Sequence, residues 1–456
     1  MKEQFDIVIE NGLVCSFEPD ELSVRNIGIR NGKIEAISKG PLSGREVIDA
    51  RHMIVAPGFI DFHSHVDGKE FSAECLVRQG ATTTIGGERN LEGGVIRRIE
   101  ENGFLINHGF YISHSFTLRQ AAGINDPYRA ATANEIQTMV KLADSFLEHG
   151  AFGLHFGLEF VPGTSEEEIY ALAEAARKRN RIVLMHLRND GIMTPEALRE
   201  AIDVAEKIGV RMHILHLHYM SGFGDLMQET IDMIDEANSR GCDITIDTGM
   251  YSAFPSCAGA SILDNGWTQK YRAGTQISDL MVSSGIYSGI RCNRQMLEYL
   301  RNEFPNTLVI GFTFEEKAIR QALEKEYAMV STNAADGPHY NNVGHPETAG
   351  TFPRLIRKYV RETGMLTLQD ALRKITIQPA RRFSIAGKGN IKTGCDADLV
   401  IFDLKRIKDC ADFVGEGDPN ASPEGIEHVL VNGRRVVCEG QITGERSAGR
   451  LLTSAR

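Results

Sequence analysis

Between residues 58 and 333 the sequence alternates short apolar strands with helical stretches, and this order limits the fold more than any other feature of the chain. Such alternation is typical of parallel α/β architecture. We expect strands at 58–63, 82–86, 109–114, 151–156, 182–186, 212–216, 243–247 and 328–333. Eight strand–helix units predict an α/β fold of the (β/α)8 TIM-barrel type, whose active site lies at the C-terminal ends of the strands.

Two helix starts can be recognised within this region. Ser165 is followed three residues later by Glu168, the spacing of a capping box. Thr194 precedes Pro195, which predicts a capped helix with proline at its first helical position.

Both ends of the chain predict strands instead of helices. Asn-Gly pairs at 11–12, 31–32 and 432–433 lie between alternating apolar runs, which is the strongest local signal for a β-hairpin. We therefore expect residues 1–57 and 385–456 to form one composite β-sandwich domain, small in comparison with the barrel.

The barrel itself is expected to span residues 58–384. Its segment 252–327 is too long for a single crossover between strands, so we predict an insertion that covers the barrel mouth as a lid. A helix is expected there at 293–304.

The net charge of −11 argues against a nucleic-acid partner, because such proteins need a basic face. No apolar run is long enough to span a membrane, and the N-terminal residues alternate like a strand and lack a signal-peptide core. The eight scattered cysteines indicate reduced thiols and a cytoplasmic protein. The sequence allows a homo-oligomer without setting its size.

Histidines recur at the ends of the expected strands. His63 and His65 end the first strand, His186 the fifth and His216 the sixth. A single strand-end histidine can be an ordinary core residue, but strand ends converge in a barrel, so these four imidazoles are expected to meet. Imidazole and carboxylate side chains suit zinc and related divalent ions.

Acidic residues complete the predicted site. Asp336, after strand eight, is the candidate catalytic residue, placed to take a proton from an attacking water and return it to the leaving nitrogen. Glu88, after strand two, is the candidate bridge between two metal ions, and Glu159, after strand four, is its rival. Each also has a simpler interpretation, as a turn residue or a solvated loop carboxylate.

The sequence resembles the amidohydrolase superfamily and, within it, the N-acyl-D-amino-acid deacylase (D-aminoacylase) family. The similar runs are residues 56–67, 80–84, 150–163, 186–190, 214–217, 335–337, 350–361 and 379–400. The resemblance implies that His63 and His65 hold one metal ion, that His186 and His216 hold a second, and that Asp336 is catalytic. His114 resembles a family histidine near the substrate.

Two departures from the family pattern concern the site. The family usually has a metal-binding cysteine after strand two, and here Glu88 lies within one residue of that place. The family is also expected to hold a substrate carboxylate with a tyrosine, a lysine and an arginine, whereas the matching residues here are Phe160, His218 and Glu347. A carboxylate would be repelled by Glu347, so a neutral, amine-bearing or cyclic amide fits better.

The sequence therefore predicts a zinc-dependent hydrolase of a carbon–nitrogen amide bond, with one or two metal ions and a small-molecule substrate. Candidate substrate-binding residues are His114, Glu159, Arg188, His218, Tyr251 and Glu347. A hydantoinase-like or dihydropyrimidinase-like ring opener is one alternative, although such enzymes usually carry a lysine where Glu159 stands. A catalytically inactive scaffold on the same barrel is the other.

Overall fold

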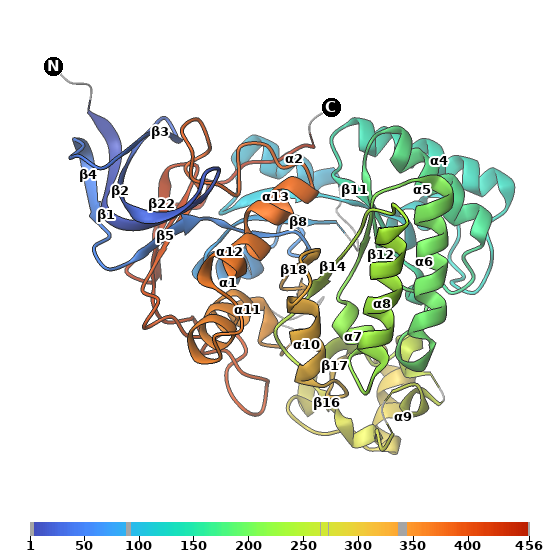
Figure 1. The fold of residues 1–456 in the computed structure, drawn as a ribbon. Coiled ribbons are helices and arrows are strands. Elements are labelled where there is room, and N and C mark those ends of the chain that lie inside the picture. Colours follow the sequence, from blue (N-terminus) through green and yellow to red (C-terminus); the bar gives the residue numbers. More distant parts are fainter. Residues whose placement is uncertain (1–3, 88–92, 265, 272, 336–343, 455–456) are drawn as a thin grey trace.

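The computed structural model of the protein describes residues 4–87, 93–264, 266–271, 273–335 and 344–454. The chain is a mixed α/β structure (Figure 1). Strands from both chain ends lie together on one side of the molecule, and the strands and helices of the central region make up the rest.

The two chain ends share a nine-stranded sheet. Its strand order is β23-β22-β21-β20-β5-β1-β2-β3, with β4 paired to β1. The strands are β1 (Phe5–Phe17), β2 (Asp20–Arg30), β3 (Lys33–Ser38), β4 (Gly44–Asp49), β5 (Ile54–Pro57), β20 (Leu399–Phe402), β21 (Ile426–Val431), β22 (Arg434–Cys438) and β23 (Gln441–Ile442). The antiparallel pair of β5 with β20 joins the N-terminal strands to the C-terminal ones.

Two of the three expected Asn-Gly turns are present. Asn31–Gly32 joins β2 to β3, and Asn432–Gly433 joins β21 to β22. The prediction of a turn at Asn11–Gly12 is wrong, because β1 runs through it with a bulge between Ile9 and Gly12. Pairing with β2 along one edge, and with β4 and then β5 along the other, keeps this segment extended.

The turns at Gly32 and Gly433 touch, so we expect Gly433→Ala to destabilise the protein by about 1–3 kcal/mol more than Gly440→Ala. Both glycines have positive φ, 74° and 72°. A Cβ on Gly433 would lie 2.8 Å from the Cα of Gly32, whereas the nearest atom to one on Gly440 is 3.5 Å away. Denaturant unfolding of both variants measures the difference, and equal losses would show that the contact between the turns adds nothing.

The central region is built on parallel strands that follow one another in chain order. They are β6 (Phe59–Asp61), β8 (Ala81–Gly86), β9 (Asn107–Phe110), β10 (Ile112–Ser113), β11 (Gly153–Gly157), β12 (Ile182–His186), β13 (Met212–Ile214), β14 (Ile244–Thr248) and β18 (Ala328–Val330). β6, β8 and β9 form one sheet, and β10 to β14 with β18 form another. Each expected strand is present within a few residues of its predicted bounds.

The last of these strands returns to the first. The short strands β7 (Ser64–His65) and β19 (Ala334–Ala335) pair in parallel, and the backbone N–H of Asn333 donates to the carbonyl of His63 at 3.0 Å. Asp61 accepts a hydrogen bond from the N–H of Thr332 at 3.1 Å. The chain segments after β6 and β18 are therefore held side by side.

Helices pack around the parallel strands (Figure 1). They are α1 (Glu70–Arg78), α2 (Gly93–Asn102), α3 (Arg119–Ala121), α4 (Ala133–Glu148), α5 (Glu166–Lys178), α6 (Thr194–Ile208), α7 (Leu217–Ser221), α8 (Leu226–Ser239), α10 (Glu316–Leu323), α11 (Glu347–Arg354), α12 (Leu368–Ile375) and α13 (Ile377–Arg382). One large apolar cluster joins α4, α5, α6 and α8 to β11–β14. A second joins the shared sheet to α1, α11 and α12.

Between β14 and β18 the chain forms a separate layer. β15 (Phe254–Cys257), β17 (Leu308–Gly311) and β16 (Leu280–Val282) make an antiparallel sheet, accompanied by α9 (Arg294–Glu303). The helix expected at 293–304 is confirmed, with Asn293 as its N-cap. The sheet was not foreseen, because its short strands are separated by long irregular segments.

The two predicted helix starts need small corrections. Ser165 caps α5 by accepting from the N–H of Glu168, but the Glu168 carboxylate binds Arg119 and His114 and does not complete the capping box. α6 begins at Thr194 with Met193 as its N-cap, because the Thr194 hydroxyl donates to the carbonyl of Met220.

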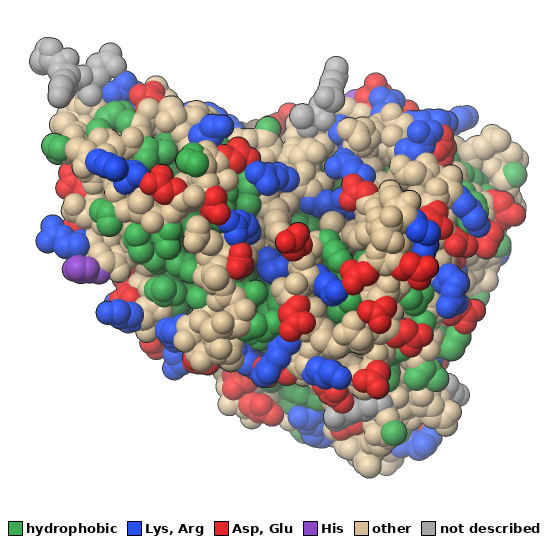
Figure 2. Space-filling view, in the orientation of Figure 1, with side chains coloured by type: hydrophobic (Ala, Val, Ile, Leu, Met, Phe, Trp, Pro, Cys, Tyr) green, Lys and Arg blue, Asp and Glu red, His purple; other side chains and the backbone are tan. Residues whose placement is uncertain are grey.

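Basic and acidic side chains are interspersed over the face shown in Figure 2. Within the described part of the chain, every helix is too short or too polar to cross a lipid bilayer.

Candidate metal centre

A buried aspartate links two of the predicted metal ligands. Asp247, near the end of β14, has one carboxylate oxygen 2.6 Å from His63 Nδ1. Its other oxygen accepts a hydrogen bond from the backbone N–H of His216 at 2.5 Å. Burial alone would raise the pKa of Asp247, but the neighbouring His63 and His213 hold it well below its usual range. Asp247 therefore acts as a charged anchor between the ends of three strands.

The backbone of His216 is strained at the point where its N–H binds Asp247. Its φ of 32° and ψ of 49° are left-handed, which is uncommon outside glycine and clusters at functional sites. β13 consequently ends at Ile214, two residues earlier than the sequence predicts.

Three histidine rings that end or follow different strands lie next to one another. The ring centroid of His216 lies 5.1 Å from that of His63 and 4.6 Å from that of His186. The ring of His65 lies 6.2 Å from that of His63. The four histidines predicted to bind metal are thus neighbours, although they are far apart in the sequence.

The chemistry of this group suits a metal ion. His216 Nδ1 is buried and has no hydrogen-bond partner among the described residues. Burial, together with the nearby His186 and His63, holds the pKa of His216 well below its usual range, which favours the neutral ring that binds metals. A buried, neutral imidazole nitrogen of this kind is a ready metal ligand.

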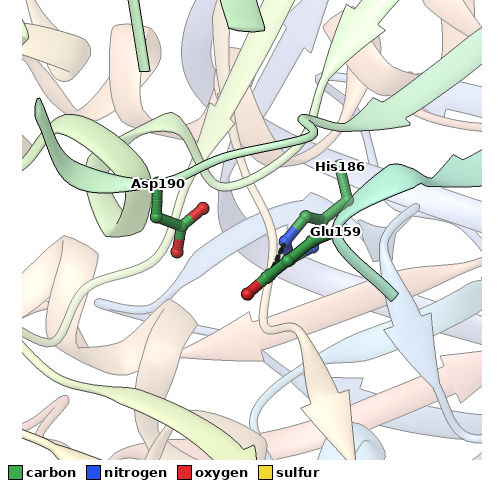
Figure 3. A group of neighbouring side chains, drawn as sticks. All are labelled: Glu159, His186 and Asp190. Atoms are coloured by element: carbon green, nitrogen blue, oxygen red, sulfur yellow. Dashed lines mark hydrogen bonds and ion pairs between the residues drawn. The ribbon is translucent and has the colours of Figure 1, made fainter. Parts of the chain in front are cut away.

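Two acidic residues lie close to His186, and the sequence analysis missed one of them, Asp190 (Figure 3). The Nε2 atom of His186 lies 2.6 Å from Glu159 Oε2, and one ligand atom from each of Glu159, His186 and Asp190 lie within 4.8 Å of one another. Burial raises the pKa of Glu159 to about 8. Burial and the charge of Glu159 raise the pKa of Asp190 to about 8.

Phe160, His218 and Glu347, which stand where the family is expected to hold a substrate carboxylate, lie close to the histidines. The His218 ring is fully buried, 3.9 Å from the ring of Tyr219, and its Nε2 has no hydrogen-bond partner within the described ranges. The Tyr219 hydroxyl donates to the Glu347 carboxylate, whose pKa burial raises well above its usual range. Phe160 lies 5.3 Å from His186, measured between ring centroids.

Three other predicted pocket residues make structural contacts. His114 lies 2.8 Å from the buried carboxylate of Glu168, which also binds Arg119. The guanidinium of Arg354 lies over the Tyr251 ring at 4.4 Å. Arg188 donates hydrogen bonds from Nε and Nη2 to the Glu200 carboxylate and one from Nη1 to the carbonyl of Pro162.

Arg188 nevertheless borders the site. It lines a cavity of about 160 Å³ together with Glu159, Asp190 and Lys270. Two residues of the predicted site, Glu88 and Asp336, lie outside the described residues.

The sequence contained a signal for Asp247 that was not used. It follows an apolar run at the end of strand seven, the same position that marked the histidines on strands one, five and six. Asp190 lies four residues beyond strand five and Tyr219 lies inside the short α7, so neither had a comparable positional signal.

A model of the amidohydrolase family matches residues 54–436, so the chain belongs to that family. Two similar relatives come from Alcaligenes xylosoxydans xylosoxydans. An N-acyl-D-glutamate deacylase is 29% identical over 99% of this chain and 97% of its own length, and a D-aminoacylase is 29% identical over 99% and 98%. The crystal structure of an N-acyl-D-glutamate deacylase from Bordetella bronchiseptica, complexed with zinc and a phosphonate inhibitor, superposes with a TM-score of 0.87. It has 26% identity and covers 99% of this chain and 100% of that one.

Proposed function

We propose that the protein is a metal-dependent hydrolase of a carbon–nitrogen amide bond. The observation that carries the proposal is the cluster of strand-end histidines joined through Asp247, with the buried His216 Nδ1 left unpaired among the described residues. Membership of the amidohydrolase family supports it. An inactive scaffold has no need to keep a buried histidine in a strained backbone conformation, as at His216.

The architecture we propose is a (β/α)8 barrel over residues 58–384, with a composite β-sandwich from residues 1–57 and 385–456. The parallel strand order and the pairing of β7 with β19 support the barrel. The nine-stranded sheet of both chain ends supports the composite domain. Residues 252–327, which contain β15–β17 and α9, are proposed as the insertion over the mouth.

Zinc is the cofactor we propose, with one or two ions in the site. His63 and His65 would hold one ion, His186 and His216 the other, and Glu88 or Glu159 would bridge them. A zinc complex of a similar deacylase supports this assignment. A divalent ion in such a place lowers the pKa of water and polarises an amide carbonyl. Asp247 would orient His63 and His216, and Asp336 would carry the proton to the leaving nitrogen.

The substrate we propose is a small amide without a free carboxylate at the place where D-aminoacylases bind one. Phe160, His218 and Glu347 stand where the resemblance implies a tyrosine, a lysine and an arginine. Glu347 is fully buried, and the donors to its carboxylate in the described structure are the neutral Tyr219 hydroxyl and Asn333 amide. This surrounding gives a substrate carboxylate no cation to pair with.

A substrate panel with the zinc-loaded enzyme tests both parts of the proposal. We expect kcat/KM for neutral, amine-bearing or cyclic amides to exceed that for N-acetyl-D-amino acids by at least about 10-fold, since a lost charged contact is worth roughly 1.5–3 kcal/mol. Preference for the N-acetyl-D-amino acids would refute the altered pocket. A purified chain that binds no zinc on reconstitution would instead favour the inactive scaffold.

The eight cysteines are all free thiols, which supports a cytoplasmic location as part of the proposal.

A further inference from the structure

Two buried carboxylates face each other beside His186. Glu159 lies in the turn after β11, His186 ends β12, and Asp190 precedes the turn Gly191–Met193. Glu159 and Asp190 are only 7% and 6% exposed. One oxygen of each carboxylate lies within 4.8 Å of the other. Carboxylates this close repel one another when both are ionised, unless a cation lies between them.

Asp190 has spare ligand capacity. Its Oδ2 accepts a hydrogen bond from the Tyr271 hydroxyl at 3.3 Å. Its Oδ1 is buried without a hydrogen-bond partner in the part of the chain that the structure describes. A buried oxygen left unsatisfied is costly, and a bound water or cation is a partner that would satisfy it.

The loop holds Asp190 in this position. Gly191 has a φ of 69°, and a Cβ there would lie 1.9 Å from the carbonyl oxygen of Lys270. That same carbonyl accepts from the N–H of Ile192 at 2.8 Å. Asp190 is thus fixed against the segment after β15, and its carboxylate converges with Glu159 and His186 (Figure 3).

We propose that Glu159, His186 and Asp190 hold a divalent cation at a position of its own, displaced from the His63–His65 pair. The inference rests on the proposed function, because the cation would be the second ion proposed there, which His186 would hold through the one lone pair of its neutral ring. One imidazole and two carboxylates within 4.8 Å match the donor set of zinc or manganese.

The surrounding charges are compatible with a cation. The cavity of about 160 Å³ beside the three side chains provides a route of entry. Of the cationic residues that line it, Arg188 is neutralised by Glu200. Lys270 lines the same cavity, and the two buried carboxylates of Glu159 and Asp190 beside it offset its positive charge.

Metal titration of the chelator-treated full chain tests the proposal. We expect Asp190→Asn to weaken one class of Zn²⁺ sites by at least about 10-fold to 100-fold, or to lower the bound zinc by about one ion per chain. Equilibrium dialysis with elemental analysis measures both quantities. Mn²⁺ bound in place of Zn²⁺, followed by electron paramagnetic resonance, gives a second readout independent of activity.

Asp264→Asn is the matched control, because Asp264 lines the same cavity but pairs with Arg301. It should bind metal like the wild type. Circular dichroism checks folding, and Glu159→Gln takes the place of Asp190→Asn in the same titration if that variant does not fold.

Unchanged zinc affinity and stoichiometry in Asp190→Asn would overturn the inference while leaving the proposed function intact. A rise in KM of Asp190→Asn, with unchanged zinc binding, would also overturn the inference. Asp190 would then bind a substrate ammonium group and not a metal. Absence of metal binding by the wild type would instead refute the proposed function itself.

Discussion

Replacing Asp247 with alanine is expected to lower the free energy of unfolding of the metal-free protein by about 3–5 kcal/mol. The substitution leaves His63 Nδ1 and the N–H of His216 without the carboxylate that they now share, and both lie in the buried interior. Ser331, whose hydroxyl donates to the same carboxylate, also loses its acceptor. Thermal or denaturant unfolding measures the loss.

The same variant should bind zinc about 10-fold to 100-fold more weakly, because Asp247 holds His63 in its orientation. Asp232→Ala removes an exposed carboxylate from α8 and serves as the control, with an expected change within about 0.5 kcal/mol. Asp247→Asn keeps the size of the side chain and one acceptor oxygen, so its stability should fall between those of Asp247→Ala and Asp232→Ala. If Asp247→Ala is as stable as the wild type and binds zinc with normal affinity, Asp247 does not anchor the site.

The sequence was most informative where a local pattern decides a local structure. The strands at 182–186 and 82–86 follow from apolar runs between helical segments, and they appear as β12 and β8 with nearly the predicted bounds. The Asn-Gly turn at 432–433 likewise needs only its own residues. At Asn11–Gly12 the same signal failed, because pairing with strands distant in the sequence kept β1 extended.

The position of the candidate site could be predicted from the sequence, but the hydrogen bonds between its residues could not. Strand ends converge, so His63, His186 and His216 could be grouped from the sequence alone. The hydrogen bonds of Asp247 to His63 and His216 depend on side-chain direction and on the left-handed backbone at His216. Those features arise only when the strands are packed together, and no spacing in the sequence encodes them.

Glu347 shows how packing changes the meaning of a residue. From the sequence it was a negative charge that repels a carboxylate. In the structure it is fully buried, Tyr219 donates to it, and burial raises its pKa well above the usual range. A protonated Glu347 is itself a hydrogen-bond donor, which favours a neutral acceptor such as an amide carbonyl on the substrate.

Asp336→Asn is expected to lower kcat by about 100-fold to 10,000-fold, the usual contribution of a general acid–base residue. Asparagine cannot accept the proton of the attacking water or deliver it to the leaving nitrogen. Zinc content should stay near that of the wild type, as measured by elemental analysis. Asp225→Asn, at an exposed position, is the control and should retain full activity.

The leaving group of the substrate separates a proton carrier from a residue that only holds the site together. The aniline released from an anilide with an electron-withdrawing ring can depart without being protonated. The amine released from an alkyl amide must first be protonated. If Asp336 protonates the leaving nitrogen, the loss of kcat in Asp336→Asn should be much smaller for the activated anilide. An equal loss for both substrates would show that Asp336 does not deliver that proton, and a loss of zinc would make it a metal ligand instead.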